Sequence, residues 1–426
     1  MNARLFLACA LVTVATTELP AQAVPETSQA ARLNPSLRRW PHAGVDPFRH
    51  VFWPRWGLAF QVGAVGGNNA LNASDVGALL FLSDRDSLLI GDIVNAFGLV
   101  PPGKGVRGLA AGEGGVHFGG PFGGRASIGL SAQTRAYGTF LIDDDAVRFF
   151  RDGNAVNPEF LIGETNGTAL ATAEGGGHAL VNAGPLGSPD GPRVTLGFGA
   201  RFVRPVYFAR GEMETNSSIA VTESSFAANV VMDVWRPLDA DDPILKGGAG
   251  LAADFLVRLA WPTSGFALEA MAANVGAKVT VDDLLHEQFS FNVSTTSLQE
   301  VSDSLDAAVF DTVGIESVEV RLPRVVRVSA SGWANRILQL DIAATLTSEG
   351  QFEEALQVEL GSTWRLLNSL PLRAGVLLGG HQGIGYTGGF GIEARNLLFR
   401  VTGSSLGGFF RTAKGAAARV ELGFFF

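Results

Sequence analysis

Two short aspartate runs carry the clearest metal-binding chemistry in this sequence. One is Asp143-Asp144-Asp145, and the other consists of Asp239, Asp241 and Asp242. Carboxylate oxygens are the ligands that calcium prefers, but neither run has the spacing of an EF-hand loop. The alternative, which we favour, is that both runs are acidic loop tips that stay solvated and oppose aggregation. The sequence therefore predicts no metal site and no cofactor.

Catalytic groups are scarce. The chain has no H-E-x-x-H helix motif, no G-x-S-x-G elbow, and no Lys-Ser or Lys-Thr pair after its glycine-rich runs "AGEGGVHFGG" and "EGGGH". His381 with Tyr386 and Thr387 is the one faint acid–base candidate, and no serine lies beside it. We interpret each of the six histidines, including His286 in a predicted loop, as solvated or as hydrogen-bonded within the protein. We predict no catalytic residue and no enzyme.

Polar and charged side chains recur at every second position in several otherwise apolar segments. From Val194 to Phe202 one face is apolar, while the other carries glycine, threonine and arginine. This period of two is typical of β-strands with one apolar and one polar face, as in a membrane barrel with a wetter lumen. The residues expected to face that lumen are Gln133, Arg135, Arg201, Gln339, Asp341, Gln357, Glu359, Arg419 and Glu421.

The last nine residues, "ARVELGFFF", repeat the pattern at the end of the chain. Val420, Leu422, Phe424 and Phe426 share the apolar face, and Arg419 and Glu421 share the other. The terminal aromatic residue resembles the C-terminal signature of bacterial outer-membrane proteins, so those four apolar residues are a candidate signal for the barrel-assembly machinery. A core strand that happens to close a soluble all-β fold is the alternative.

The beginning of the chain predicts export. Arg4 precedes a short apolar run, and Ala21-Gln22-Ala23 fits a cleavage site, so residues 1–23 are expected to be a cleaved signal peptide. The sole cysteine, Cys9, lies within it. The net charge of −9 disfavours nucleic-acid binding, and the 54 glycines with little helical periodicity favour β structure.

Fourteen strands are expected, and the connections between them alternate between long and short in the first half. The long connections are 67–103, 143–192, 236–249 and 276–321, and the alternation weakens after residue 346. An up-and-down membrane barrel predicts such alternation. The strands are expected at 57–66, 104–118, 124–142, 193–212, 217–235, 250–261, 266–275, 322–333, 336–346, 353–364, 371–380, 384–393, 396–404 and 417–426.

Three further features flank these strands. Residues 24–50 are expected to be a lead-in or a plug, followed by the barrel over 51–426. The aromatic cluster Phe52 to Trp56 is expected beside the first strand at a membrane interface. Short amphipathic helices are expected near Ser83 to Phe97 and between Ser297 and Phe310, in loops or in the lumen.

Several stretches resemble the long-chain fatty-acid channel superfamily of outer-membrane barrels, including its poorly characterised branch that resembles the barrel shuttle of type IX secretion. "GGNNAL" from Gly66 and "WPTSGFALEAMAANVGAKVTV" from Trp261 are similar to family segments. The order "LPRVVRVSASGWANRILQLDIAATL", "LPLRAGVLLGG", "GYTGGFGIEARNLLFRVTGS" and "RVELGFFF" resembles its closing strands, although Ser329 stands where the pattern has glycine. The resemblance implies fourteen strands, an N-terminal plug and, in some members, passage of hydrophobic molecules.

We therefore expect an all-β, closed antiparallel up-and-down transmembrane barrel of about fourteen strands in an outer membrane. Its expected partners are the lipid bilayer, the assembly machinery and a hydrophobic small-molecule ligand. Passive transport of small hydrophobic molecules is the first functional hypothesis. A non-transport barrel that docks secreted or envelope proteins is the alternative, and a soluble exported lectin or adhesin is the third.

Overall fold

A computed structural model describes most of the chain after its N-terminal tenth. The described residues are 46–72, 97–98, 100, 102–103, 105–123, 125–152, 157–187, 191–222, 225–239, 244–296, 309–335, 337–348, 354–367, 369–409 and 412–426. The signal peptide predicted over 1–23 and almost all of the two predicted helices lie outside these residues. No described helix is long and apolar enough to span a membrane.

Within the described residues, fourteen strands close into one antiparallel barrel, which confirms the predicted fold class. Each pairs with the next, and β18 pairs with β1 to complete the ring. The strands are β1 (Gly57–Asn68), β2 (Val106–Phe122), β3 (Ala126–Ile142), β5 (Asn166–Pro185), β6 (Arg193–Met213), β9 (Gly250–Trp261), β10 (Phe266–Thr295), β12 (Arg324–Trp333), β13 (Leu338–Ser348), β14 (Glu354–Leu367), β15 (Leu370–Gly379), β16 (Gly385–Glu393), β17 (Leu397–Leu406) and β18 (Gly415–Phe425).

The predicted number of strands is right, but one barrel strand was missed and one predicted strand lies outside the barrel. The expected long connection 143–192 contains β5, which pairs with β3 and β6 along almost its whole length. The expected barrel strand 217–235 instead forms β7 (Ser218–Val221) and most of β8 (Phe226–Pro237), which lie outside the ring. The "EGGGH" run from Glu174 therefore lies in a barrel strand and not in the predicted connection 143–192.

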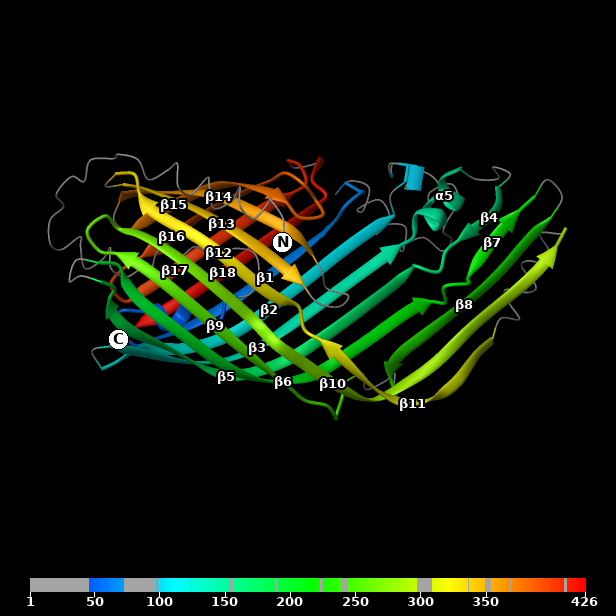
Figure 1. The fold of residues 1–426 in the computed structure, drawn as a ribbon, viewed down its shortest axis with the longest axis horizontal. Helices are drawn as coiled ribbons and strands as arrows, with labels where there is room; N and C mark the ends of the chain where they lie inside the picture. The colour runs from blue at the N-terminus through cyan, green and yellow to red at the C-terminus, as the bar shows by residue number, and fades with distance from the viewer. Residues whose placement is uncertain are drawn as a thin grey trace.

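Corrected strand boundaries restore a regular alternation of connections. Short turns such as 262–265, 334–337 and 394–396 lie at one end of the barrel, and the longer connections lie at the other. The weakening after residue 346 came from misplaced boundaries. We call these the short-turn end and the loop end. The C-terminus lies at the short-turn end (Figure 1).

A sheet extends beyond the barrel at the loop end (Figure 1). It combines β4 (Asn157–Leu161), β7, β8 and β11 (Val309–Arg321) with the outer parts of β6 and β10. The expected connection 276–321 is wrong, because β10 continues to Thr295 and runs for 30 residues. A membrane-crossing strand needs only about 9–11 residues, so β10 leaves the barrel and enters this extension.

The first aspartate run caps a helix at the loop end. Helix α5 (Asp144–Asp152) begins directly after Asp143, whose Oδ1 accepts a hydrogen bond of 2.8 Å from the Asp145 amide. Asp145 also pairs with Arg148 at 2.6 Å. Acidic side chains stabilise a helix N-terminus through its free amides and dipole. Among the described residues, no group of three or more His, Cys, Asp or Glu side chains is placed to hold a metal ion.

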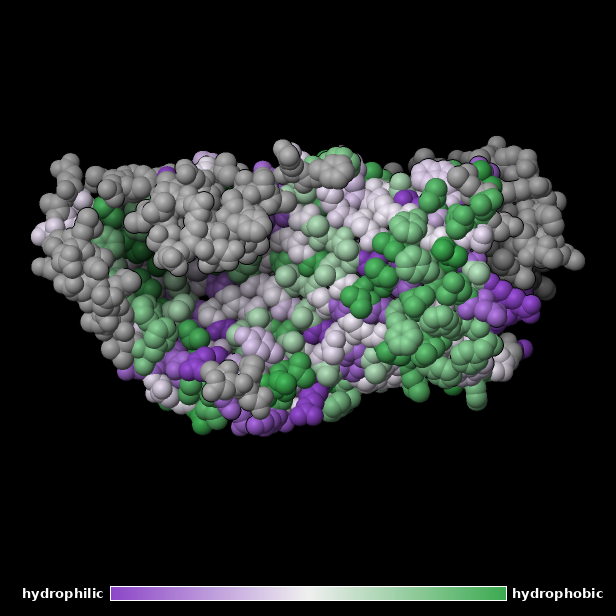
Figure 2. All heavy atoms as spheres, turned by 180° about the vertical axis from the view of Figure 1, so that it is seen from behind, coloured by the Kyte–Doolittle hydropathy of each residue, from purple (hydrophilic) through white to green (hydrophobic). Residues whose placement is uncertain are grey.

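The outward faces of the barrel strands carry most of the exposed apolar side chains. Figure 2 shows them gathered over the outside of the molecule. On β18 the outward set includes Val420, Phe424 and Phe426, while Phe425 is buried inside. Further outward members are Phe60, Val62, Leu130, Phe198, Leu251, Val328, Leu340, Leu360, Leu372 and Phe390.

Candidate functional site

The inward faces of the strands carry buried charges that form a connected network. Arg135 on β3 pairs with Glu174 on β5 at 3.2 Å, and Gln133 donates to the same carboxylate at 3.0 Å. Glu174 also binds Arg201 on β6. Arg201 in turn donates two hydrogen bonds, of 2.8 and 2.9 Å, to Asp254 on β9. Ion pairs across adjacent strands thus link four neighbouring strands at mid-height in the lumen.

The network continues in both directions around the barrel. Arg419 on β18 binds Glu113 on β2, which lies 3.9 Å from Arg135. On the other side, the Asn274 side chain accepts a 2.5 Å bond from Arg201 and donates to the Pro323 carbonyl at 2.8 Å. Asn274 has a φ of 59°, a left-handed conformation that asparagine tolerates better than most residues, and it lies in a bulged part of β10.

Two glycines make room for the largest members of this network. A Cβ on Gly199 would collide with the His178 ring, and a Cβ on Gly176 would collide with Arg201. Both glycines directly face the strand that carries the side chain in question, since Gly199 pairs with His178 and Gly176 with Arg201. The glycine-rich sequence of β5 and β6 therefore serves packing inside the lumen.

A second set of ion pairs lines the opposite wall. Arg373 on β15 binds Asp341 through two bonds of 2.7 Å and Glu359 at 2.6 Å. Arg400 on β17 and Arg365 on β14 both bind Glu393 at 2.6 Å. Buried arginine is stable only with such partners, because an unpaired charge away from water costs several kcal/mol.

Residues 46–56, which we call the lumen strap, cross the inside of the barrel. Arg49, in the short helix η2 (Arg49–Phe52), binds Glu421 on β18. Phe48 packs with Leu256 and Met271 on β9 and β10. Contacts with such distant strands can form only through the lumen, so this segment partly fills it.

Aromatic stacking fixes the strap further. His50 stacks on His117 of β2, with ring centres 3.7 Å apart, and Phe48 meets His178 edge-on at 5.4 Å. Trp53 is buried and meets Phe425 edge-on at 5.2 Å. The membrane-interface position predicted for the whole cluster Phe52 to Trp56 is therefore wrong for Trp53. Trp56 alone joins the outward rings, by stacking on Phe118 at 5.1 Å.

The lumen becomes apolar on the loop side of the network. Tyr137, Val203 and Ala252 lie two residues beyond Arg135, Arg201 and Asp254 on the same inward faces. They belong to a closely packed apolar cluster on the wall that β3, β5, β6, β9 and β10 form. Its members are Tyr137, Leu170, Val203, Phe208, Leu245, Ala252, Ala277, Val279, Val281, Leu284 and Leu322.

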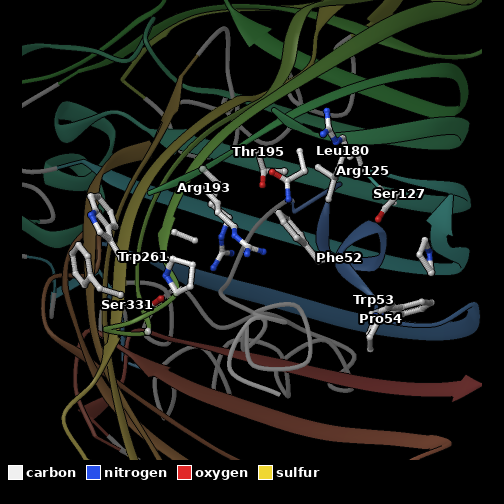
Figure 3. A pocket seen from close by; sticks show the side chains of 18 of the residues that line it. Phe52, Trp53, Pro54, Arg125, Ser127, Leu180, Arg193, Thr195, Trp261 and Ser331 are labelled. Carbon is white, nitrogen blue, oxygen red and sulfur yellow. The ribbon is translucent and has the colours of Figure 1, made fainter. Parts of the chain in front are cut away.

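The lumen opens into a cavity on the short-turn side of the strap. The cavity has a volume of about 300 Å³. Phe52, Trp53 and Pro54 of the strap form one wall, and strands β3, β5, β6, β9, β10, β12 and β13 contribute the others. Figure 3 shows Arg193 and Phe52 between Trp261 and Ser331 on one side and Ser127 and Trp53 on the other.

The lumen-facing wall of the extension holds a separate polar cluster. His286 lies in β10, not in a loop as predicted, and its nitrogens lie 3.0 Å from Asp233 and from Glu316. Its ring stacks on Trp235 at 4.5 Å, and the Arg210 guanidinium lies 5.2 Å from the Trp235 ring centre. Partial burial lowers the pKa of His286, but the two carboxylates outweigh it and raise the pKa above 6.5.

The nine residues predicted to face the lumen lie in barrel strands. Five are buried there, whereas Gln339, Asp341, Gln357 and Arg419 are partly buried. Whether any of them contacts a solute stays a prediction. Sequence reasoning missed Glu113, Glu174, Asp254 and the strap. The available signal for Asp254 was its spacing from Arg258, because two charges four residues apart in a strand lie on the same face.

The candidate acid–base set is not assembled. Tyr386 points outward and packs edge-on against Phe409, with ring centres 5.5 Å apart. Thr387 is its neighbour on β16 and therefore lies on the other face, where its hydroxyl is 3.4 Å from the Gly403 carbonyl. These two residues cannot join His381 in one site.

Comparisons with known proteins find no matching family model and no matching curated protein. Among solved structures, the chain is similar to the toluene transporter TbuX of Ralstonia pickettii, with 10% identity over 89% of this chain and 92% of that chain, at a TM-score of 0.47. It is also similar to a FadL homologue of Pseudomonas aeruginosa, with 13% identity over 89% and 93% of the two chains, at a TM-score of 0.44.

A third similar structure is the toluene transporter TodX of Pseudomonas putida, with 8% identity over 92% of each chain and a TM-score of 0.42. Identities this low and TM-scores below 0.5 do not assign a function, and the barrel architecture rests on its own strand pairing.

Proposed function

We propose that the protein is an outer-membrane barrel. The support is the closed ring of strands, whose outward faces are apolar and whose inward faces carry the paired charges. An apolar outer belt around a polar lumen is the arrangement that a bilayer requires of a spanning sheet. The outward residues Val420, Leu422, Phe424 and Phe426 then form the signal read by the assembly machinery during biogenesis.

We further propose that the barrel passes small hydrophobic molecules by passive diffusion. One observation carries this proposal, the packed apolar cluster that lines one wall at the loop side of the lumen. General porins have a polar, water-filled lumen at this level. An apolar compartment resists ions and sugars, which must lose their hydration to enter, while it costs a hydrophobic solute nothing in lost hydrogen bonds.

Liposome permeation tests this function. Liposomes that contain the refolded barrel should take up a long-chain fatty acid or an alkane faster than empty liposomes, while glucose uptake stays at the empty-liposome rate. Heat-denatured protein in the same lipid is the control. Hydrocarbon uptake equal to that of empty liposomes would exclude passive transport, and rapid glucose uptake would indicate a general pore.

The extension favours a second candidate, a barrel that docks secreted or envelope proteins. Among the described residues, strand β11 has a paired register only with β10, and its side chains Phe310, Val313 and Ile315 are exposed. A strand edge with exposed apolar residues can accept a partner strand. If a pull-down from envelope extracts returned one protein in equal amount, and if permeation failed, docking would replace transport as the proposed function.

A further inference from the structure

The cavity on the short-turn side of the strap holds two arginines without partners. The side chains of Arg125 and Arg193 make no ion pair or hydrogen bond with any part of the chain that the structure describes, and both line the cavity. The buried arginines at mid-height are all neutralised, as Arg201 is by Glu174 and Asp254. Two positive charges therefore lie at this mouth without a carboxylate partner among the described residues.

A third guanidinium reinforces the positive field. Arg258 lines the same cavity, and Thr195, the residue that faces it on β6, is two positions from Arg193 on the same inward face. Glu269 lies 3.5 Å from Arg258 and offsets its charge, and the guanidinium also lies 5.4 Å from the Phe52 ring centre. Arg125 and Arg193 are both exposed at the rim of the cavity, so they add a positive potential to its mouth that salt can screen.

The remaining walls suit a compact apolar body. Aromatic rings from the strap and from β9, β10 and β12 line the cavity, together with hydroxyl and amide groups. Aromatic walls gain most from contact with another flat ring or a short hydrocarbon chain. The rings are Phe52, Trp53, Trp261, Phe266 and Trp333, and the small polar groups are Ser127, Asn182, Thr195, Ser331 and Gln339.

We propose that this cavity binds a small apolar carboxylate, such as one with a single aromatic ring, with its carboxylate at the mouth where Arg193 and Arg125 lie and its ring against Phe52 and Trp261. Guanidinium groups bind carboxylates through paired, charge-assisted hydrogen bonds. The volume of about 300 Å³ lies at the lower end of the range for ligand pockets, which favours a compact molecule. The site needs a closed barrel but does not require that solutes cross it.

Titration calorimetry of the folded, detergent-solubilised full chain tests the proposal with three probes. Benzoate carries both the ring and the charge, benzyl alcohol carries the ring alone, and inorganic phosphate carries the charge alone. We expect benzoate to bind at least tenfold more tightly than either of the others. Its affinity should fall as salt rises, because exposed charges are screened.

Three variants locate the site. Arg193→Gln and Arg125→Gln should each weaken benzoate binding several-fold, and the double variant should remove its advantage over benzyl alcohol. The matched control is Arg395→Gln, an exposed arginine in the β16–β17 turn at the same end but outside the cavity lining. Its affinity should equal that of the wild type. Far-UV circular dichroism checks that each variant is folded.

Each other outcome overturns the proposal. Equal affinity for benzyl alcohol and benzoate would mean that the arginines do not bind the ligand. Equal affinity for phosphate and benzoate would indicate a general anion patch without a role for the rings. Failure of Arg193→Gln to differ from Arg395→Gln would place any binding elsewhere. None of these results depends on permeation, so they leave the proposed transport function to its own test.

Discussion

At the scale of single residues, the strands around the lumen are joined by ion pairs between buried side chains. The side chains of Arg201, Glu174 and Asp254 are fully buried, and each relies on the others. Loss of one member leaves an unpaired charge, which costs more than the pair itself contributes. Substitutions of these residues should therefore destabilise the barrel strongly, whereas substitutions at solvated ion pairs should have little effect on stability.

Arg201→Leu should lower the free energy of unfolding by about 3–5 kcal/mol, because Glu174 and Asp254 lose their shared partner. Urea titration of the barrel in phospholipid vesicles measures this. The control is Glu319→Gln, which breaks the 2.7 Å pair with Lys278 whose side chains are 53% and 50% exposed. That loss should stay within about 1 kcal/mol, and equal losses would show that burial does not set the cost.

Gly199→Ala should destabilise the barrel by about 1–3 kcal/mol, since the new methyl group displaces the His178 ring and its 3.0 Å contact with Asp254. Gly138→Ala is the matched control, because a Cβ there meets no atom closer than 4.0 Å. The same urea titration compares the two variants. A similar effect of both would point to a general preference for glycine in the strands.

At the scale of elements, the extension is held by polar contacts between its strands. His286 on β10 joins Asp233 on β8 to Glu316 on β11, so its protonation ties three strands together. Burial lowers its pKa, but the carboxylates raise it overall, above 6.5. The hydrogen bonds to His286 and Trp235 lower the pKa of Glu316 below 4.5.

The extension should therefore be most stable between about pH 4.5 and the raised pKa of His286. The contribution of His286 is fully present below 6.5 and is lost as pH rises through the folded pKa. The contribution of Glu316 is present above 4.5 and is lost as pH falls through its folded pKa. Amide hydrogen exchange, corrected for the intrinsic pH effect, should show faster opening of β8 at pH 9 than at pH 6.

His286→Gln should remove most of the alkaline step, whereas Lys278→Gln, in the half-exposed pair on β10, should leave it in place. An unchanged pH profile in His286→Gln would assign the step to another group.

The sequence predicted most elements, because alternation with a polar face is strong in strands such as β18. It missed β5, since glycine and alanine dilute the apolar signal across "ATAEGGGHAL" and leave no bulky outward face. Glycine is needed there because side chains of the neighbouring strands occupy the space that a Cβ would take. Those contacts form only in the folded barrel, so the local sequence does not show them. The strap contacts were equally hidden, because Arg49 and Glu421 are 372 residues apart.

At the scale of the whole molecule, the lumen has three levels: an apolar cluster at the loop side, the ion network with the strap in the middle, and the basic cavity at the short-turn side. The strap crosses the lumen, and the apolar cluster lines one wall on its loop side. A solute on the proposed route would pass both.

Arg49→Ala should loosen the strap, because it removes the contact with Glu421. Planar-bilayer recordings should then show ion-conducting openings that are rare in the wild type. Arg55→Ala changes the same strap, but Arg55 makes no side-chain ion pair among the described residues, so it should leave conductance unchanged. Identical recordings from both variants would mean that the strap does not close the lumen.

The proposed membrane barrel requires that alternate residues of each strand face the lipid and the lumen. The only cysteine lies in the predicted signal peptide, so single cysteines can be placed without further change. A fluorophore attached to a single cysteine should be quenched by nitroxide-labelled lipid when the cysteine replaces Leu130, Leu360 or Val420. It should not be quenched when the cysteine replaces the inward neighbour Ser131, Gly361 or Arg419. Equal quenching of both sets, or quenching of neither, would contradict a membrane barrel.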